Sequence, residues 1–288
     1  MARDHADWRR DHQLWIEAFV LLNFAGLVGD IFLAHSENQF RRAAEYVPLY
    51  FSMAATVALA AALALRNRMP GVWRDVGHLV GWLGVGIGLA GVIFHLDSRF
   101  FYERTIRGLT YGAPFAAPLA YTGLGLLLIV NRLVAPDSRE WAQWVLLLAL
   151  GGFAGNFVFS LSDHAQNGFF NPLEWVPVVS SAFAIGCLAV PFIVSVDRGF
   201  IGLCACVLAV QALIGVIGFA LHAEADLRRP GRTLFERVLG GAPPMAPLLF
   251  PNLVTLGGIG LWALAAGIPP TESRRRQHGD PRSAPSSP

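Results

Sequence analysis

The chain has 288 residues, of which 54% are hydrophobic and only 15% are charged, and its formal net charge is +2. Water-soluble domains carry nearer a quarter charged residues, so this composition excludes an ordinary soluble enzyme, and the near-neutral charge gives no sign of a nucleic-acid partner. All 22 basic residues are arginine, which excludes a lysine Schiff base with retinal or pyridoxal and the P-loop lysine of an ATP-driven pump.

Eight apolar runs follow one another along the chain, and each is about as long as a helix that crosses the hydrocarbon core of a bilayer. They lie at 14–34, 47–65, 77–95, 112–134, 141–162, 175–196, 200–221 and 245–268. Pro118 and Pro251 lie inside two of these runs and predict kinks there. The sequence therefore predicts an all-α integral membrane protein with eight transmembrane helices, whose main partner is the lipid bilayer.

Short polar segments flank the apolar runs. Residues 1–13 carry charges of both signs, and residues 269–288 are rich in Arg, Ser and Pro, which predicts a disordered tail. With the N-terminus in the cytoplasm, 13 arginines fall on the cytoplasmic side and 9 on the outer side. This bias favours a multi-pass protein of the cell inner membrane with both termini in the cytoplasm.

An internal repeat relates the two halves of the chain. A shift of 129 residues aligns positions 15–60 with 144–189 without a gap, and 15 of these 46 positions are identical. The same shift aligns Gly112-Ala113-Pro114 with Gly241-Ala242-Pro243. The pattern predicts two four-helix units, 14–135 and 141–268. Because four spans is an even number, both units insert in the same direction, as parallel repeats about a pseudo-two-fold axis along the membrane normal.

Four histidines occupy the C-terminal ends of the odd-numbered runs, and all four are therefore expected at one membrane face, the outer one. Imidazole binds zinc, copper or iron, and a neighbouring carboxylate can ligate the ion or orient the ring. The predicted ligands are His35, His95, His164, His222, Asp30, Asp97, Asp163 and Glu224. They can form one site on the axis or one two-histidine site per unit, and haem between two imidazoles is a variant.

Such a site suits a membrane-embedded redox or hydrolytic enzyme, or an electron-transfer subunit. The competing interpretation is that histidine simply tolerates the headgroup region. No HExxH, HxxxH or Glu-x-x-His spacing occurs, so any metal site has to be assembled from different spans.

Two further functions remain open. A transporter for a small solute or ion would carry its substrate along the axis between the repeats, and a non-catalytic accessory factor would bind another membrane subunit. The outer loops also mix arginine with aromatic residues, which is typical of segments lying on headgroups. The residues predicted to bind a substrate or lipid there are Arg99, Arg104, Arg228, Arg232, Asn38 and Asn167.

Overall fold

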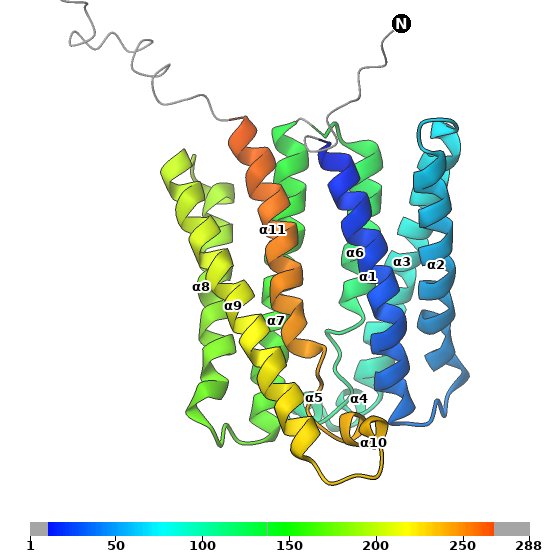
Figure 1. The fold of residues 1–288 in the computed structure, drawn as a ribbon, viewed down its shortest axis with the longest axis vertical. Helices are drawn as coiled ribbons and strands as arrows, with labels where there is room; N and C mark the ends of the chain where they lie inside the picture. Colours follow the sequence, from blue (N-terminus) through cyan, green and yellow to red (C-terminus); the bar gives the residue numbers. More distant parts are fainter. Residues whose placement is uncertain (1–10, 137, 268–288) are drawn as a thin grey trace, which may run out of the picture.

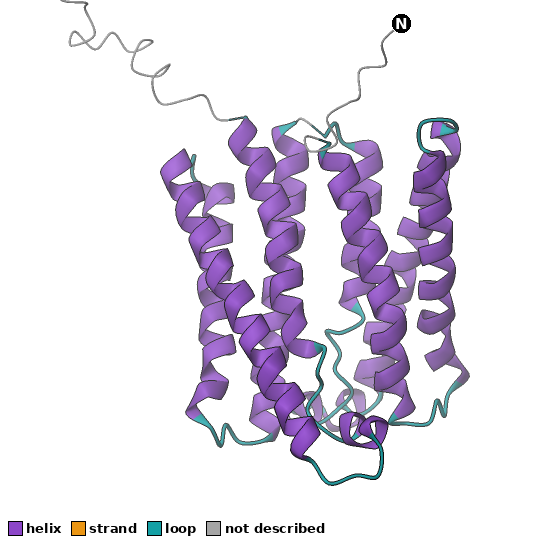
Figure 2. Cartoon of the chain, in the orientation of Figure 1, coloured by secondary structure: helices purple, strands orange, loops and turns teal. Residues whose placement is uncertain are grey.

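The computed structural model describes residues 11–136 and 138–267, and over these ranges the chain folds into α-helices and short 3-10 turns without a strand (Figure 2). The main helices are α1 (His12–Ser36), α2 (Tyr46–Leu65), α3 (Pro70–Asp97), α6 (Leu119–Leu133), α7 (Arg139–Gln166), α8 (Trp175–Ile193), α9 (Arg198–Arg228) and α11 (Leu249–Ala266). Short helices α4 (Phe100–Glu103), α5 (Ile106–Thr110) and α10 (Leu234–Leu239) lie in the loops. The predicted tail and most of the predicted N-terminal segment fall outside the described residues.

Seven helical segments in the described part of the chain are long and apolar enough to cross a membrane. They are His12–Ser36, Ala43–Leu65, Pro70–Asp97, Arg139–Gln166, Pro172–Ile193, Arg198–Arg228 and Ala246–Ala266. The chain is thus a multi-pass helical protein with an apolar surface suited to a bilayer. The predicted span 112–134 is helical only over the 15 residues of α6, which reach about 22 Å against a hydrocarbon core of about 30 Å. Seven of the eight predicted spans are therefore supported.

Proline explains the shortness of α6. Residues 111–118 form turns, and Pro118 is the residue that precedes the helix. Pro251 lies in the first turn of α11, where a missing N–H breaks no intrahelical hydrogen bond. The expected kinks at Pro118 and Pro251 are therefore wrong, because both prolines lie where a helix begins and not in its interior.

The helices pack in two groups that meet at the centre of the molecule (Figure 1). In the N-terminal half (α1, α2, α3 and α6), α1 contacts α2 and α6, and α3 contacts α2 and α6. In the C-terminal half (α7, α8, α9 and α11), α7 contacts α8 and α11, and α9 contacts α8 and α11. The halves meet through α1 with α11 and α6 with α7. The same order of contacts in both halves is what a duplication would produce, but the repeat symmetry itself stays a prediction.

Apolar side chains fill the centre. Leu128, Leu146 and Phe153 have no exposed surface, and they come from α6 and α7. A pair of polar side chains joins the halves near the centre: the side-chain amides of Asn23 and Asn252 donate to each other at 3.3 and 2.5 Å. The reciprocal pairing satisfies both amides where water is scarce.

Candidate functional site

Three of the predicted histidines, His35, His95 and His164, lie in the last turns of α1, α3 and α7. His222 lies six residues before the end of α9, at the same end of the bundle. This end, called the histidine end below, is the lower one in Figure 1 and carries α4, α5 and α10. The short helices cross between the halves, since α5 contacts α7 and α10 contacts α1. The Gln166 amide also donates to the Thr110 carbonyl at 2.9 Å. The histidine end is thus covered by loops from the opposite half.

A tight chain reversal follows the first histidine of each half. The backbone N–H of Phe40 donates to the His35 carbonyl at 3.1 Å, and that of Phe169 donates to the His164 carbonyl at 3.0 Å. Both phenylalanines adopt left-handed backbone conformations, with φ of 47° and 50°. Non-glycine residues rarely adopt this conformation, so the surrounding contacts have to hold it. The reversal directs the chain back toward the histidine it has just left.

The reversal brings a glutamate against each of these histidines. His35 Nδ1 lies 3.8 Å from Glu45 Oε2, and His164 Nδ1 lies 3.7 Å from Glu174 Oε2. Both carboxylate oxygens are buried and have no hydrogen-bond partner. A buried charged oxygen without a donor is costly, and here it occurs twice at matched positions.

The other histidine of each half binds a proline carbonyl. His95 Nδ1 lies 2.9 Å from the Pro114 oxygen, and His222 Nδ1 lies 3.0 Å from the Pro243 oxygen. A carbonyl only accepts hydrogen bonds, so Nδ1 is the protonated nitrogen in both rings. The neutral ring then presents the lone pair of Nε2. Histidines that bind metals through one nitrogen are usually held in this way through the other.

The histidines pair within each half. The rings of His35 and His95 lie 6.4 Å apart between centroids, at an interplanar angle of 76°. His164 and His222 are close enough to interact electrostatically. The geometry therefore favours one two-histidine cluster per half over a single four-histidine site on the axis. These clusters are called the first cluster (His35, Glu45 and His95) and the second cluster (His164, Glu174 and His222).

The four carboxylates predicted as metal ligands differ in their contacts. Asp97 accepts a hydrogen bond from the Tyr102 hydroxyl at 3.3 Å, and Glu224 pairs with Arg228 at 2.6 Å. Neither contact involves a histidine. Asp163 interacts electrostatically with His222, whereas Asp30 lies deeper in α1 with an exposed side chain.

The residues predicted to bind a substrate or lipid are spread over the histidine end. Arg99 pairs with Glu103 at 2.6 Å and Arg228 with Glu224, so both guanidinium groups are engaged by glutamates one helical turn away. Arg104 and Asn167 end helices, and Asn38 and Arg232 lie exposed in loops. The described contacts do not gather these residues into one binding site.

Glu45 and Glu174 are the residues that reasoning from sequence missed. They are identical under the 129-residue shift, which was the available signal. Nearness along the chain pairs each histidine with a different carboxylate. The chain reversals at Phe40 and Phe169 instead bring Glu45 and Glu174, ten residues further along, against His35 and His164.

Within residues 11–136 and 138–267, no three His, Cys, Asp or Glu side chains already stand in an arrangement that could hold a metal ion. The comparisons with known proteins add no relative: no family model matches the chain, and neither a curated protein nor a solved structure matches it significantly.

Proposed function

We propose that this chain is a membrane-embedded metalloprotein with two matched transition-metal sites near one membrane face. Its first cluster would hold one ion and its second cluster another. The observation that carries the proposal is the buried, unpartnered oxygen of Glu45 and of Glu174, each facing a histidine nitrogen. A cation between nitrogen and carboxylate would satisfy both atoms.

The distances support direct ligation. Zinc lies about 2.0–2.2 Å from imidazole nitrogen and carboxylate oxygen, so two of its ligand atoms lie about 3.4 Å apart at a tetrahedral angle. The observed separations of 3.8 and 3.7 Å are slightly longer, so a small movement of the side chains would bring both atoms onto one ion. His95 and His222 would complete the sets through Nε2, while their Nδ1–H groups keep the hydrogen bonds to the Pro114 and Pro243 carbonyls.

Two histidines and one glutamate are a ligand set that occurs in catalytic zinc sites. Catalytic zinc sites use three such ligands and keep a fourth position open for water or substrate, whereas structural sites fill all four positions. The proposed sites therefore suit a redox or hydrolytic enzyme, or an electron-transfer subunit, better than a purely structural metal. Haem would require space for a porphyrin between the two rings, and a bare ion needs none.

Transport along the axis has less support. At the end opposite the histidines, the central helices are packed by fully buried apolar side chains such as Leu128 and Leu146. A solute path between the halves would have to separate them. The contact pattern of the two halves and the paired clusters support a parallel duplication, and the arginine count supports cytoplasmic termini, so we include both in the proposal.

Metal analysis of the detergent-purified protein tests the proposal. After loading with Zn²⁺, Cu²⁺ or Fe²⁺ and removal of excess metal, elemental analysis is expected to give two ions per chain. Glu45→Gln or His164→Ala should each lower this to one, and the double variant to none. Glu37→Gln, an exposed carboxylate near His35, and His78→Ala, nearer the opposite end of α3, serve as matched controls.

Unchanged metal content in the double variant would refute the sites, as would protein that binds none of the three metals. A visible absorption spectrum of protein purified without added metal separates a bare ion from haem. If the unmodified protein shows a Soret band that His35→Ala lacks, the group bound at these residues is haem and not a bare ion.

A further inference from the structure

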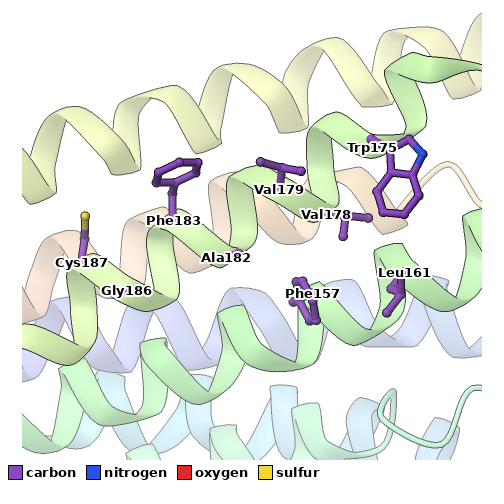
Figure 3. Close-up of a pocket in the computed structure, with 9 residues that line it drawn as sticks. All are labelled: Phe157, Leu161, Trp175, Val178, Val179, Ala182, Phe183, Gly186 and Cys187. Atoms are coloured by element: carbon purple, nitrogen blue, oxygen red, sulfur yellow. The ribbon is translucent and has the colours of Figure 1, made fainter.

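The apolar groove of the C-terminal half does not include the second cluster. It lies between α7 and α8 and is lined by side chains such as Phe157 and Phe183 (Figure 3), and none of its lining residues is charged. A buried charged residue of this half lies instead in the last turn of α9, where Asp226 has only 3% of its surface exposed. Carboxylates are rarely buried so deeply without a compensating group, so the contacts of Asp226 indicate its role.

One oxygen of Asp226 holds the loop that faces His222. Asp226 Oδ1 accepts a hydrogen bond from the Ala242 N–H at 2.9 Å. The carbonyl of the next residue, Pro243, lies 3.0 Å from His222 Nδ1. Asp226 and His222 are four residues apart on α9, so both lie on the helix face that meets this loop. The carboxylate is packed so closely against the loop that Gly241 has no room for a Cβ. Asp226 therefore fixes the carbonyl that sets the tautomer of His222.

The first half contains the same arrangement with a neutral residue. Ser98 Oγ accepts a hydrogen bond from the Ala113 N–H at 3.0 Å, and the Pro114 carbonyl lies 2.9 Å from His95 Nδ1. The Ser98 hydroxyl also donates to the His95 carbonyl at 2.6 Å. Serine thus holds the loop of the first half, but it adds no charge there.

The second oxygen of Asp226 has no partner. Asp226 Oδ2 is buried and accepts no hydrogen bond. Two nearby arginines are engaged elsewhere, because Arg228 pairs with Glu224 at 2.6 Å and Arg237 donates to two backbone carbonyls of its own loop at 3.1–3.2 Å. A cation in the second cluster, one helical turn away at His222, would offset the cost of burying this carboxylate.

We propose that Asp226 is a positioning residue of the second metal site and makes it the stronger of the two sites. The inference rests on the metal sites proposed above. Through Ala242 and Pro243, Asp226 keeps His222 Nε2 free for the ion, and its charge attracts the ion. Ser98 supplies only the first of these effects. A divalent cation should therefore fill the second site before the first.

Nitrogen-15 NMR of the histidine-labelled full chain in micelles, after treatment with a chelator, tests the positioning role. Asp226→Ala removes the acceptor for the Ala242 N–H and should lower the fraction of His222 that is protonated on Nδ1, with His95 unchanged. Asp226→Asn keeps an acceptor oxygen and should preserve the Nδ1 proton. Ser98→Ala should change His95 and leave His222 unchanged. An unaltered His222 tautomer in Asp226→Ala would overturn the positioning role.

Zinc titration of the same samples tests the order of filling. In the unmodified protein, the His222 signals should reach half of their shift at a free zinc concentration about tenfold or more below that for His95, because a charge one helical turn from a partly buried ion acts strongly on it. Asp226→Asn should remove most of this difference while the His222 tautomer stays the same.

Glu236→Gln is the matched control. It removes an exposed carboxylate at the same end of the bundle, and glutamine can still accept the hydrogen bond from the Arg232 N–H. Both titration curves should equal those of the unmodified protein.

Equal half-saturating zinc concentrations at His95 and His222 would overturn the stronger second site, as would an Asp226→Asn curve that equals the unmodified one. Zinc-induced shifts at neither ring would refute the metal sites themselves, and the stronger site with them. The spectra of chelator-treated protein decide separately whether Asp226 positions His222, so the two failures are distinguishable.

Discussion

Glu17 and Arg132 form an ion pair inside the N-terminal half, with 3% and none of their side-chain surfaces exposed. The pair belongs to a network: the Asn131 amide donates to Glu17 Oε1 at 2.8 Å, and the Arg132 guanidinium lies 3.7 Å from the centre of the Trp73 ring. Under the 129-residue shift, Glu17 aligns with Leu146 and Arg132 with Leu261. Both leucines are buried. At these aligned positions, the N-terminal half contains a buried ion pair and the C-terminal half contains two buried leucines.

This comparison predicts the outcome of a double-mutant cycle. Glu17→Leu or Arg132→Leu alone leaves a buried charge without its partner and should lower the free energy of unfolding by about 3–5 kcal/mol. The double variant Glu17→Leu/Arg132→Leu reproduces the pair found in the other half and should lie within about 1–2 kcal/mol of the unmodified protein. Reversible unfolding in detergent micelles provides the measurement. If the losses of the single variants simply add in the double variant, the buried charges do not depend on each other.

A second difference between the halves concerns Tyr121, which corresponds to Phe250. The Tyr121 hydroxyl donates to the Pro48 carbonyl at 3.0 Å and contacts the Ser52 hydroxyl at 2.5 Å. In the other half, Ser181 donates directly to the Pro177 carbonyl at 2.8 Å. Serine can therefore satisfy this carbonyl without a tyrosine.

Tyr121→Phe is accordingly expected to cost no more than about 1 kcal/mol of unfolding free energy, the net value of one hydrogen bond, because Ser52 can turn to Pro48 as Ser181 does to Pro177. Unfolding curves beside those of Tyr50→Phe, an exposed tyrosine, give the comparison. A loss clearly above about 1 kcal/mol would show that Ser52 stays unpaired, since a buried unsatisfied group costs about 1–3 kcal/mol.

The apolar runs and the matched prolines made much of the fold predictable, whereas the limits of α6 were not. Hydropathy stays high from 112 to 134 and so predicts a full span. Pro114 and Pro118 interrupt it, and residues 111–118 form turns in place of a helix. Hydropathy reports whether a segment suits the membrane, but it does not report whether the backbone there is helical.

The histidines were predictable for a related reason, and the glutamates were not. A residue at the end of a span lies at a known face, so four span-terminal histidines gather at one end of the bundle. Glu45 reaches His35 only because the chain reverses through the left-handed conformation of Phe40. A phenylalanine gives no local signal for this conformation, unlike glycine, which adopts it freely.

Close packing of α3 against α6 leads to a third prediction. A Cβ added at Gly88 would lie 2.6 Å from the Thr122 nitrogen and 2.8 Å from the Pro118 oxygen, both backbone atoms that cannot turn away. Gly88→Ala should therefore force the helices apart and lower the free energy of unfolding by about 1–3 kcal/mol.

Gly86→Ala on the same helix provides the matched control, since a Cβ there meets nothing within 4 Å. Because alanine favours helix by up to about 1 kcal/mol over glycine, this variant should be neutral or stabilising. Equal stability of the two variants would show that α3 and α6 are not in close contact at Gly88.

The proline carbonyls make a prediction about the histidines themselves. The Pro114 oxygen at 2.9 Å from His95 Nδ1, and the Pro243 oxygen at 3.0 Å from His222 Nδ1, can only accept. Both neutral rings should therefore carry their proton on Nδ1, the less common tautomer of the free histidine side chain in water. Nitrogen-15 NMR of histidine-labelled protein in micelles distinguishes the two nitrogens. His95→Ala and His222→Ala assign the signals.

On addition of Zn²⁺, the proposed sites require the Nε2 signals of these two rings to shift while Nδ1 stays protonated, because the carbonyl keeps its hydrogen bond as the free lone pair binds the ion. Glu45→Gln should weaken the zinc-induced shift of His95 and leave that of His222 unchanged, since Glu45 lies against His35 and interacts electrostatically with His95, both in the first half. A proton on Nε2 in the metal-free protein would contradict the hydrogen bonds to Pro114 and Pro243. Zinc-induced shifts at Nδ1 would place the ion on the other side of the rings, where it would have to displace both carbonyls.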